Sequence, residues 1–122
     1  MDMIAKLLVG LVAVAHIAFL ILEMFLWTTP YARKSFNMTP EFAEASAGLA
    51  ANQGLYNGFL AAGLIWGLVA GAGGFEITVF FLACVIVAGL YGGATVKRSI
   101  FFLQAVPAIL ALAVVLLARK GA

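Results

Sequence analysis

The chain has 122 residues, of which 66% are hydrophobic and only 10% charged, and its formal net charge is +2. Soluble domains carry about 45–50% apolar and about 25% charged residues, so this composition excludes an ordinary soluble domain and predicts an integral membrane protein surrounded by the lipid bilayer. The charges are spread along the chain rather than clustered, and we therefore expect no nucleic acid as a partner.

The first predicted helix covers residues 4–27, a run long enough to cross a bilayer core about 30 Å thick. Within it, His16 and Glu23 share one stripe of the helix with Leu20 and Trp27, because steps of three and four residues return to the same face. An ionisable side chain inside a membrane span is costly and usually marks a functional site. The start of the run resembles a signal peptide, but cleavage would remove half of the span, so we expect a retained helix.

The segment 28–47 is the one long loop that the sequence predicts. Its aromatic and basic residues suit the membrane interface. Near its end, Thr39 is followed by Pro40 and Glu41, which is a hydroxyl cap, a proline at the first helical position and an acid in the first turn. We therefore expect the second helix to begin near Pro40, outside the bilayer.

The second apolar run covers residues 48–70 and carries the densest polar signal. Four polar side chains fall within six positions, in two adjacent rows: Asn52, Gln53, Tyr56 and Asn57. Gly54 and Gly58 form a small-xxx-small pair, which we expect on roughly the opposite face, where a neighbouring helix can approach closely. Each of these side chains either hydrogen-bonds one helix to another or belongs to a site. Four polar side chains so close together favour a site.

The third and fourth runs cover residues 77–96 and 99–118, joined by the basic pair Lys97-Arg98. Pro107 removes one backbone hydrogen bond and is expected to interrupt the fourth helix. Gly89 and Gly93 predict a close helix contact. The polar side chains of these two runs are Tyr91, Thr95 and Gln104.

Short turns favour antiparallel neighbours, so the predicted fold is all-α, an integral membrane four-helix up-down bundle that forms a single domain. In this topology the loop 28–47 and the Lys97-Arg98 turn lie on one side of the membrane. Nearly every buried polar group then gathers in that half of the bilayer, where one pocket is lined by Glu23, Asn52, Tyr56 and Gln104. His16 would lie at its floor, near the midplane.

The chemistry that this pocket predicts depends on Glu23, because no lysine or arginine lies near it within the spans. A carboxyl beside the amide and phenol groups of Asn52, Gln53 and Tyr56 is a candidate for proton-linked binding or general-base chemistry. The alternative is that Glu23, four residues from the helix end, only reaches the interface. A single His and Glu seven residues apart match no zinc spacing, so we expect no metal, and the sequence leaves any cofactor open.

Taken together, these motifs resemble the domain-of-unknown-function 1304 family of small, mostly bacterial membrane proteins. The resemblance spans the whole chain, and its most specific piece is the run from Asn52 to Asn57. It implies four membrane helices and makes the polar residues the family's site, but it implies no activity. The residues that carry it are His16, Glu23, Trp27, the run 52–57, the stretch 88–92, Thr95, Gln104 and Pro107-Ala108.

Three functions fit these observations. The first is binding or transport of a small organic or amphipathic molecule, linked to protons through Glu23. Four helices are too few to enclose a transport path, so transport would need a homodimer. The second is an intramembrane enzyme, an isomerase or a reductase subunit, using His16 or Glu23 as acid or base. The third is a structural or partner subunit without a ligand. In each case the expected location is the bacterial inner membrane.

Overall fold

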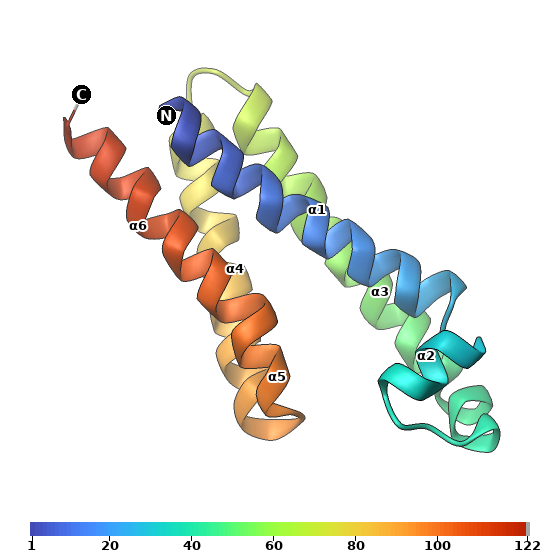
Figure 1. The fold of residues 1–122 in the computed structure, drawn as a ribbon. Coiled ribbons are helices and arrows are strands. Elements are labelled where there is room, and N and C mark those ends of the chain that lie inside the picture. The colour runs from blue at the N-terminus through green and yellow to red at the C-terminus, as the bar shows by residue number, and fades with distance from the viewer. Residues whose placement is uncertain (122) are drawn as a thin grey trace. The chain divides into compact units, whose positions relative to one another are not determined.

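The computed structural model describes residues 1–121, with only the backbone of Gly121, and all the regular secondary structure in this part of the chain is helical (Figure 1). The helical residues from Arg98 to Gly121 form one continuous helix, which consists of three segments. In chain order the elements are α1 (Met3–Phe25), α2 (Pro30–Ser35), α3 (Pro40–Val69), α4 (Gly74–Thr95), α5 (Arg98–Ile100), the π-helical η1 (Phe101–Ala105) and α6 (Val106–Gly121). The all-α prediction is therefore confirmed.

The start of α3 is the one that the sequence predicts. Pro40 is its first residue, and the Thr39 hydroxyl accepts a hydrogen bond from the backbone N–H of Phe42 at 3.1 Å. The segment 28–47, predicted as a loop, also contains the short helix α2. Thr29 caps α2 by accepting a hydrogen bond from the backbone N–H of Ala32 at 3.3 Å.

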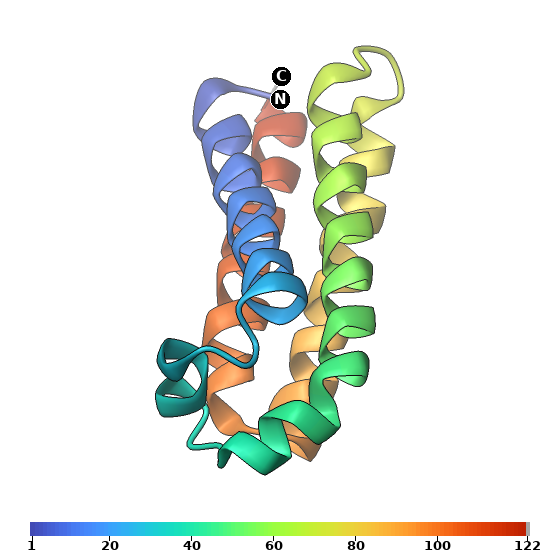
Figure 2. The same ribbon diagram turned by 90° about the vertical axis from the view of Figure 1, so that its right-hand side faces the viewer.

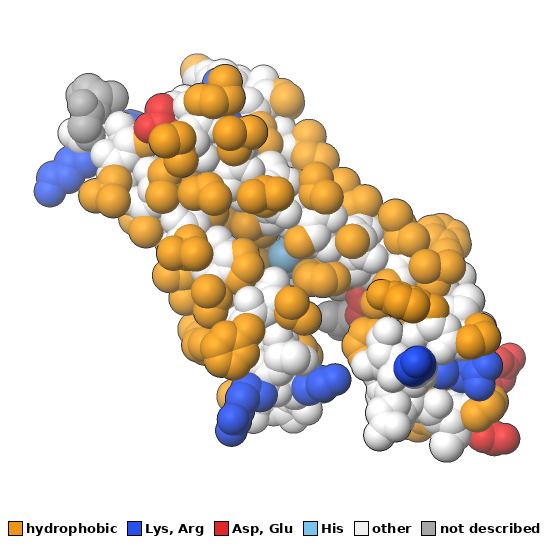
Figure 3. All heavy atoms as spheres, viewed as in Figure 1, with side chains coloured by type: hydrophobic (Ala, Val, Ile, Leu, Met, Phe, Trp, Pro, Cys, Tyr) orange, Lys and Arg blue, Asp and Glu red, His pale blue; other side chains and the backbone are white. Residues whose placement is uncertain are grey.

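Within residues 1–121, three helices are long and apolar enough to cross a membrane: Met3–Phe25, Gly74–Thr95 and Arg98–Lys120. Only 22 to 28% of the residues in their most apolar stretches are buried within the protein, so lipid is the natural cover for the rest. Figure 3 shows the apolar side chains spread across the face in view, with Lys and Arg gathered near α2, at the start of α5 and near the end of α6.

The predicted second span, residues 48–70, is not among these three helices. Helix α3 is long enough, with 30 residues in one unbroken helix (Figure 2). Its apolar character is lower because the run from Asn52 to Asn57 places amides and a phenol in its middle. The same polar residues that indicate a site therefore make this helix the least typical of a membrane span.

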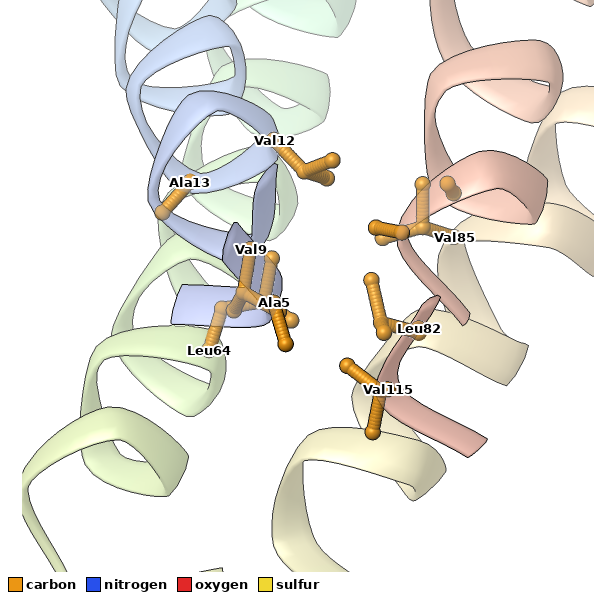
Figure 4. Close-up of a cluster of buried hydrophobic side chains, with 10 residues drawn as sticks. Ala5, Val9, Val12, Ala13, Leu64, Leu82, Val85 and Val115 are labelled. Carbon is orange, nitrogen blue, oxygen red and sulfur yellow. The ribbon is translucent and has the colours of Figure 1, made fainter. Parts of the chain in front are cut away.

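The chain divides into two compact units. The first unit joins Met1–Val14 to the chain from Leu60 onward, and the second unit is Ala15–Phe59. In the first unit, side chains from α1, α3, α4 and α6 point toward one another and form an apolar core (Figure 4). Its fully buried members include Val9, Leu64, Leu82, Val85 and Val115.

Glycines set how closely the helices of the first unit approach. A Cβ atom added at Gly89 of α4 would lie 2.6 Å from the backbone nitrogen of Ala105, and one at Gly93 would lie 2.6 Å from the Cβ of Phe101. This close contact of α4 with η1 is the one that Gly89 and Gly93 predict. Such contacts hold helices together in lipid, where no hydrophobic force acts between them.

The predicted interruption of the last helix takes the form of η1, which ends two residues before Pro107. The backbone N–H of Val106 bonds to the carbonyl of Phe101, five residues earlier, as in a π-helix. Proline has no N–H for the regular bond to Leu103, so the widened turn lies where that bond is missing.

Candidate functional site

The second unit contains the contact between the end of α1 and the beginning of α3. A Cβ atom added at Gly54 would lie 2.7 Å from Met24 Cγ and 3.1 Å from Glu23 Cβ, and one at Gly58 would lie 2.6 Å from Leu20 Cδ1. The stripe that carries Leu20 and Glu23 on α1 therefore faces α3. The glycines were expected on the side of α3 away from the polar site; instead they form the surface that Glu23 packs against.

Glu23 and Asn57 form a hydrogen-bonded pair across this contact. The Asn57 side-chain Nδ2 donates to Glu23 Oε1 at 2.6 Å. Asn57 is only 5% exposed, whereas Glu23 is half-buried. Asn57 reaches Glu23 because it lies three residues after Gly54 on α3, on the face that the glycines open. The predicted neighbours Asn52, Gln53 and Tyr56 are not the ones that make the bond.

The electrostatic setting of Glu23 is unusual for a carboxyl. Among the described residues, no lysine or arginine is recorded in an ion pair with Glu23, whereas Arg119 pairs with Glu76 at 4.0 Å. Asn57 bonds one carboxyl oxygen, and the half-burial of Glu23 leaves the group accessible on one side. A neutral amide offsets only part of the cost of placing a carboxylate in an apolar region.

His16 lies on the same stripe of α1 but is 1% exposed. Its ring packs edge-to-face against Phe19, with the ring centroids 5.1 Å apart. The position on the stripe agrees with the prediction, while the burial limits direct access of a ligand to the imidazole.

Trp27, the last residue of the stripe, connects the segment after α1 to α3 by a hydrogen bond. Its indole Nε1 donates to Ser46 Oγ at 2.9 Å, and Ser46 Oγ in turn donates to the carbonyl of Phe42 at 2.7 Å. The Trp27 ring also packs on Phe36, with centroids 5.1 Å apart. Ser46 is a contact that sequence reasoning missed; the signal for it is a hydroxyl in the early turns of α3 together with a tryptophan just after the end of α1.

The remaining polar residues of α3 face outward. Asn52 and Gln53 are exposed, and Tyr56 is 57% exposed with its ring edge-to-face against Phe59. No described hydrogen bond joins these three side chains to Glu23. Their part in a site stays a prediction.

The other predicted site residues belong to the first unit. Tyr91 is exposed, and Thr95 Oγ1 donates to the Tyr91 carbonyl at 2.6 Å, a bond within one helix. Gln104 is half-buried in η1. Their part in one site with Glu23 also stays a prediction. Within residues 1–121, no group of three His, Cys, Asp or Glu side chains is gathered as a metal ion would require.

Long apolar helices, which are candidate membrane spans by their length and composition, indicate that this chain is a helical integral membrane protein. The chain belongs to the family described as "Protein of unknown function (DUF1304)", whose model matches residues 10–116. It is 34% identical over 114 residues to the uncharacterized protein YpaA of Lactococcus lactis subsp. lactis (strain IL1403), which covers 92% of this chain and 96% of that protein. No solved structure matches the chain. The resemblance seen in the sequence is thereby confirmed.

Proposed function

We propose that Glu23 and Asn57 form a binding site within the membrane for a small organic or amphipathic molecule, and that binding is linked to protons through Glu23. The observation that carries this proposal is the pair itself: a half-buried carboxyl on an apolar helix, bonded by one amide and without a basic partner among the described residues. Asn57 orients the carboxyl, and the carboxyl accepts the ligand's polar head.

The charge of the site favours one kind of ligand. An ionised carboxyl in an apolar region is stabilised by a positive charge or a strong hydrogen-bond donor. The ligand therefore has an apolar body and a cationic or donating head. A proton and a cationic head compete for the same carboxyl, so lowering the pH weakens binding of the cation. Transport by this exchange would need a second copy of the chain to complete the wall around the path.

We also propose that α3 is the fourth membrane crossing and that the protein is a four-helix up-down bundle in the bacterial inner membrane. At 1.5 Å per residue, 30 helical residues extend about 45 Å, more than the bilayer core. The amides of α3 are tolerated in lipid when they are bonded between helices, as Asn57 is.

A structural role is the second candidate, and the same pair favours it. The hydrogen bond joins α1 to α3 beside Gly54 and Gly58, where it would stabilise the packing of the two helices. The burial of His16 gives no support to an enzyme that uses its imidazole as a base.

Binding of tetraphenylphosphonium, a lipophilic cation, to the protein in liposomes separates these two functions. In the wild type, we expect binding to weaken as the pH is lowered. Glu23→Gln keeps the size and the hydrogen bond but removes the charge, and it should weaken binding by about tenfold or more. Glu41→Gln, the same change at an exposed acid at the start of α3, serves as the control and should bind like the wild type. Equal binding by the Glu23 and Glu41 variants would leave only the structural role.

Cysteine labelling tests the fourth crossing. In a Cys84→Ser background, single cysteines at Ser35 and Ala72 flank α3. We expect an impermeant reagent to label them from opposite sides of the membrane. Labelling of both from the same side would show that α3 does not cross.

A further inference from the structure

The first unit contains a second polar feature that does not involve Glu23. A cavity of about 380 Å³ lies where α1 and α4 begin and where α3 and α6 end. Lys6 and Arg119 line it from α1 and α6, and Phe75 and Glu76 line it from α4. The turn from Gly71 to Gly74, which joins the end of α3 to the start of α4, also lines it. Because this is where the apolar helices end, we expect the cavity at the level of the lipid headgroups.

The cationic side of the cavity is held in place. The guanidinium carbon of Arg119 lies 4.1 Å from the centroid of the Phe75 ring, a cation–π contact. Arg119 Nη1 also lies 4.0 Å from Glu76 Oε1, in an exposed ion pair. This geometry engages one edge of the guanidinium, and its other N–H donors remain for a ligand. Lys6 adds a second positive charge on the α1 side of the cavity.

The turn adds backbone donors. Gly71 and Gly73 have φ angles of 67° and 84°, and a Cβ atom added at either would meet nothing within 4 Å, so a ligand can approach the backbone closely there. Gly73 caps α4 without a side chain. The Gly74 N–H bonds to the Gly71 carbonyl at 3.0 Å, and no described hydrogen bond occupies the N–H groups of Phe75 and Glu76, two residues that line the cavity.

From the cavity, its two cations and the open turn, the geometry points to a binding site for a phosphate group at the membrane surface, and specifically for the headgroup of an anionic phospholipid. Basic pockets between helix ends bind anionic headgroups, whereas a zwitterionic lipid brings its own cation and gains less. Among the described residues that line the cavity, the acid is Glu76, and it competes with the phosphate for Arg119.

Titration of the detergent-purified protein with phosphatidylglycerol, followed by native mass spectrometry, tests this site. We expect phosphatidylglycerol to bind more tightly than phosphatidylcholine. Lys6→Gln and Arg119→Gln should each weaken its binding by about fivefold. Glu76→Gln should strengthen it, since it removes the competing acid. Lys120→Gln is the matched control, with the same charge change next to Arg119 but outside the cavity.

The outcomes are distinct. If inorganic phosphate alone binds as tightly as phosphatidylglycerol and loses affinity in the same variants, the phosphate site stands and its ligand is the free ion. If Lys120→Gln weakens lipid binding as much as Lys6→Gln does, the attraction is a diffuse surface charge and the site is overturned. Unchanged or weaker binding by Glu76→Gln would also contradict the proposed competition. None of these results depends on Glu23.

Discussion

The two units of the molecule use glycine in the same way and polar side chains in opposite ways. In the first unit, Gly89 brings α4 against η1 around an apolar core, and the buried Thr78 hydroxyl has no hydrogen-bond partner among the described residues. In the second unit, Gly58 brings α3 against α1, and the contact is crossed by hydrogen bonds from Asn57 and Trp27. Close packing therefore needs no polar group in this protein, which makes the polar pairs of the second unit the more informative feature.

The largest expected effect is that of Gly89→Leu. The atom nearest to an added Cβ is the Ala105 backbone nitrogen, at 2.6 Å, which cannot move without shifting η1. We expect a loss of stability of about 3 kcal/mol or more, measured by thermal unfolding in detergent. Gly10→Leu, where an added Cβ meets nothing within 4 Å, is the control. Similar melting temperatures for the two variants would contradict the close contact.

Gly58→Leu should cost less than Gly89→Leu. Its added Cβ would meet the end of the Leu20 side chain, which can change rotamer more easily than a backbone can shift. We expect about 1–2 kcal/mol, still more than for Gly10→Leu. If Gly58→Leu is as stable as Gly10→Leu, the contact of α1 with α3 is looser than the structure indicates.

Asn57→Ala removes the donor to Glu23 and should cost about 1 kcal/mol, the usual size of a hydrogen bond between membrane helices. Asn52→Ala is the same change five residues earlier at an exposed position, and it should leave the stability unchanged. The comparison is made by thermal unfolding of both variants. Equal effects would mean that the pair contributes nothing specific to the second unit.

The smallest effect is expected for Thr78→Val, which keeps the shape of the side chain and removes a buried hydroxyl that has no described partner. Stability should be unchanged or rise by up to about 1 kcal/mol. Thr95→Val, which removes a hydroxyl bonded to the Tyr91 carbonyl, should give no such gain. A clear loss in Thr78→Val would reveal a polar interaction inside the first unit and weaken the contrast between the units.

Much of this fold follows from the sequence because hydropathy and helix caps are local signals. The start of α3 at Pro40, the contact at Gly89 and Gly93 and the interruption before Pro107 each depend on a few neighbouring residues. The stripe of His16, Leu20, Glu23 and Trp27 was equally local, and Leu20 and Glu23 face α3 as a stripe should.

The partner of Glu23 was harder to predict, because it depends on the rotation of α3 about its own axis. The sequence places amides on several faces of α3, and a rotation of about 100° per residue decides which one meets Glu23. We expected the glycine face to point away from the site. The structure instead brings Gly54, Gly58 and Asn57 to the same contact, because only a face without side chains admits α1 closely enough for the bond.

Proton release on ligand binding is the most direct test of the claim that Glu23 works by exchanging a proton for a cation. Tetraphenylphosphonium binding is measured by calorimetry in two buffers of different ionisation enthalpy at the same pH. The account predicts that the wild type releases protons as the cation binds, so its heat depends on the buffer, and that Glu23→Gln shows no such dependence. A binding heat that is the same in both buffers for the wild type, or equal proton release by Glu23→Gln, would contradict it.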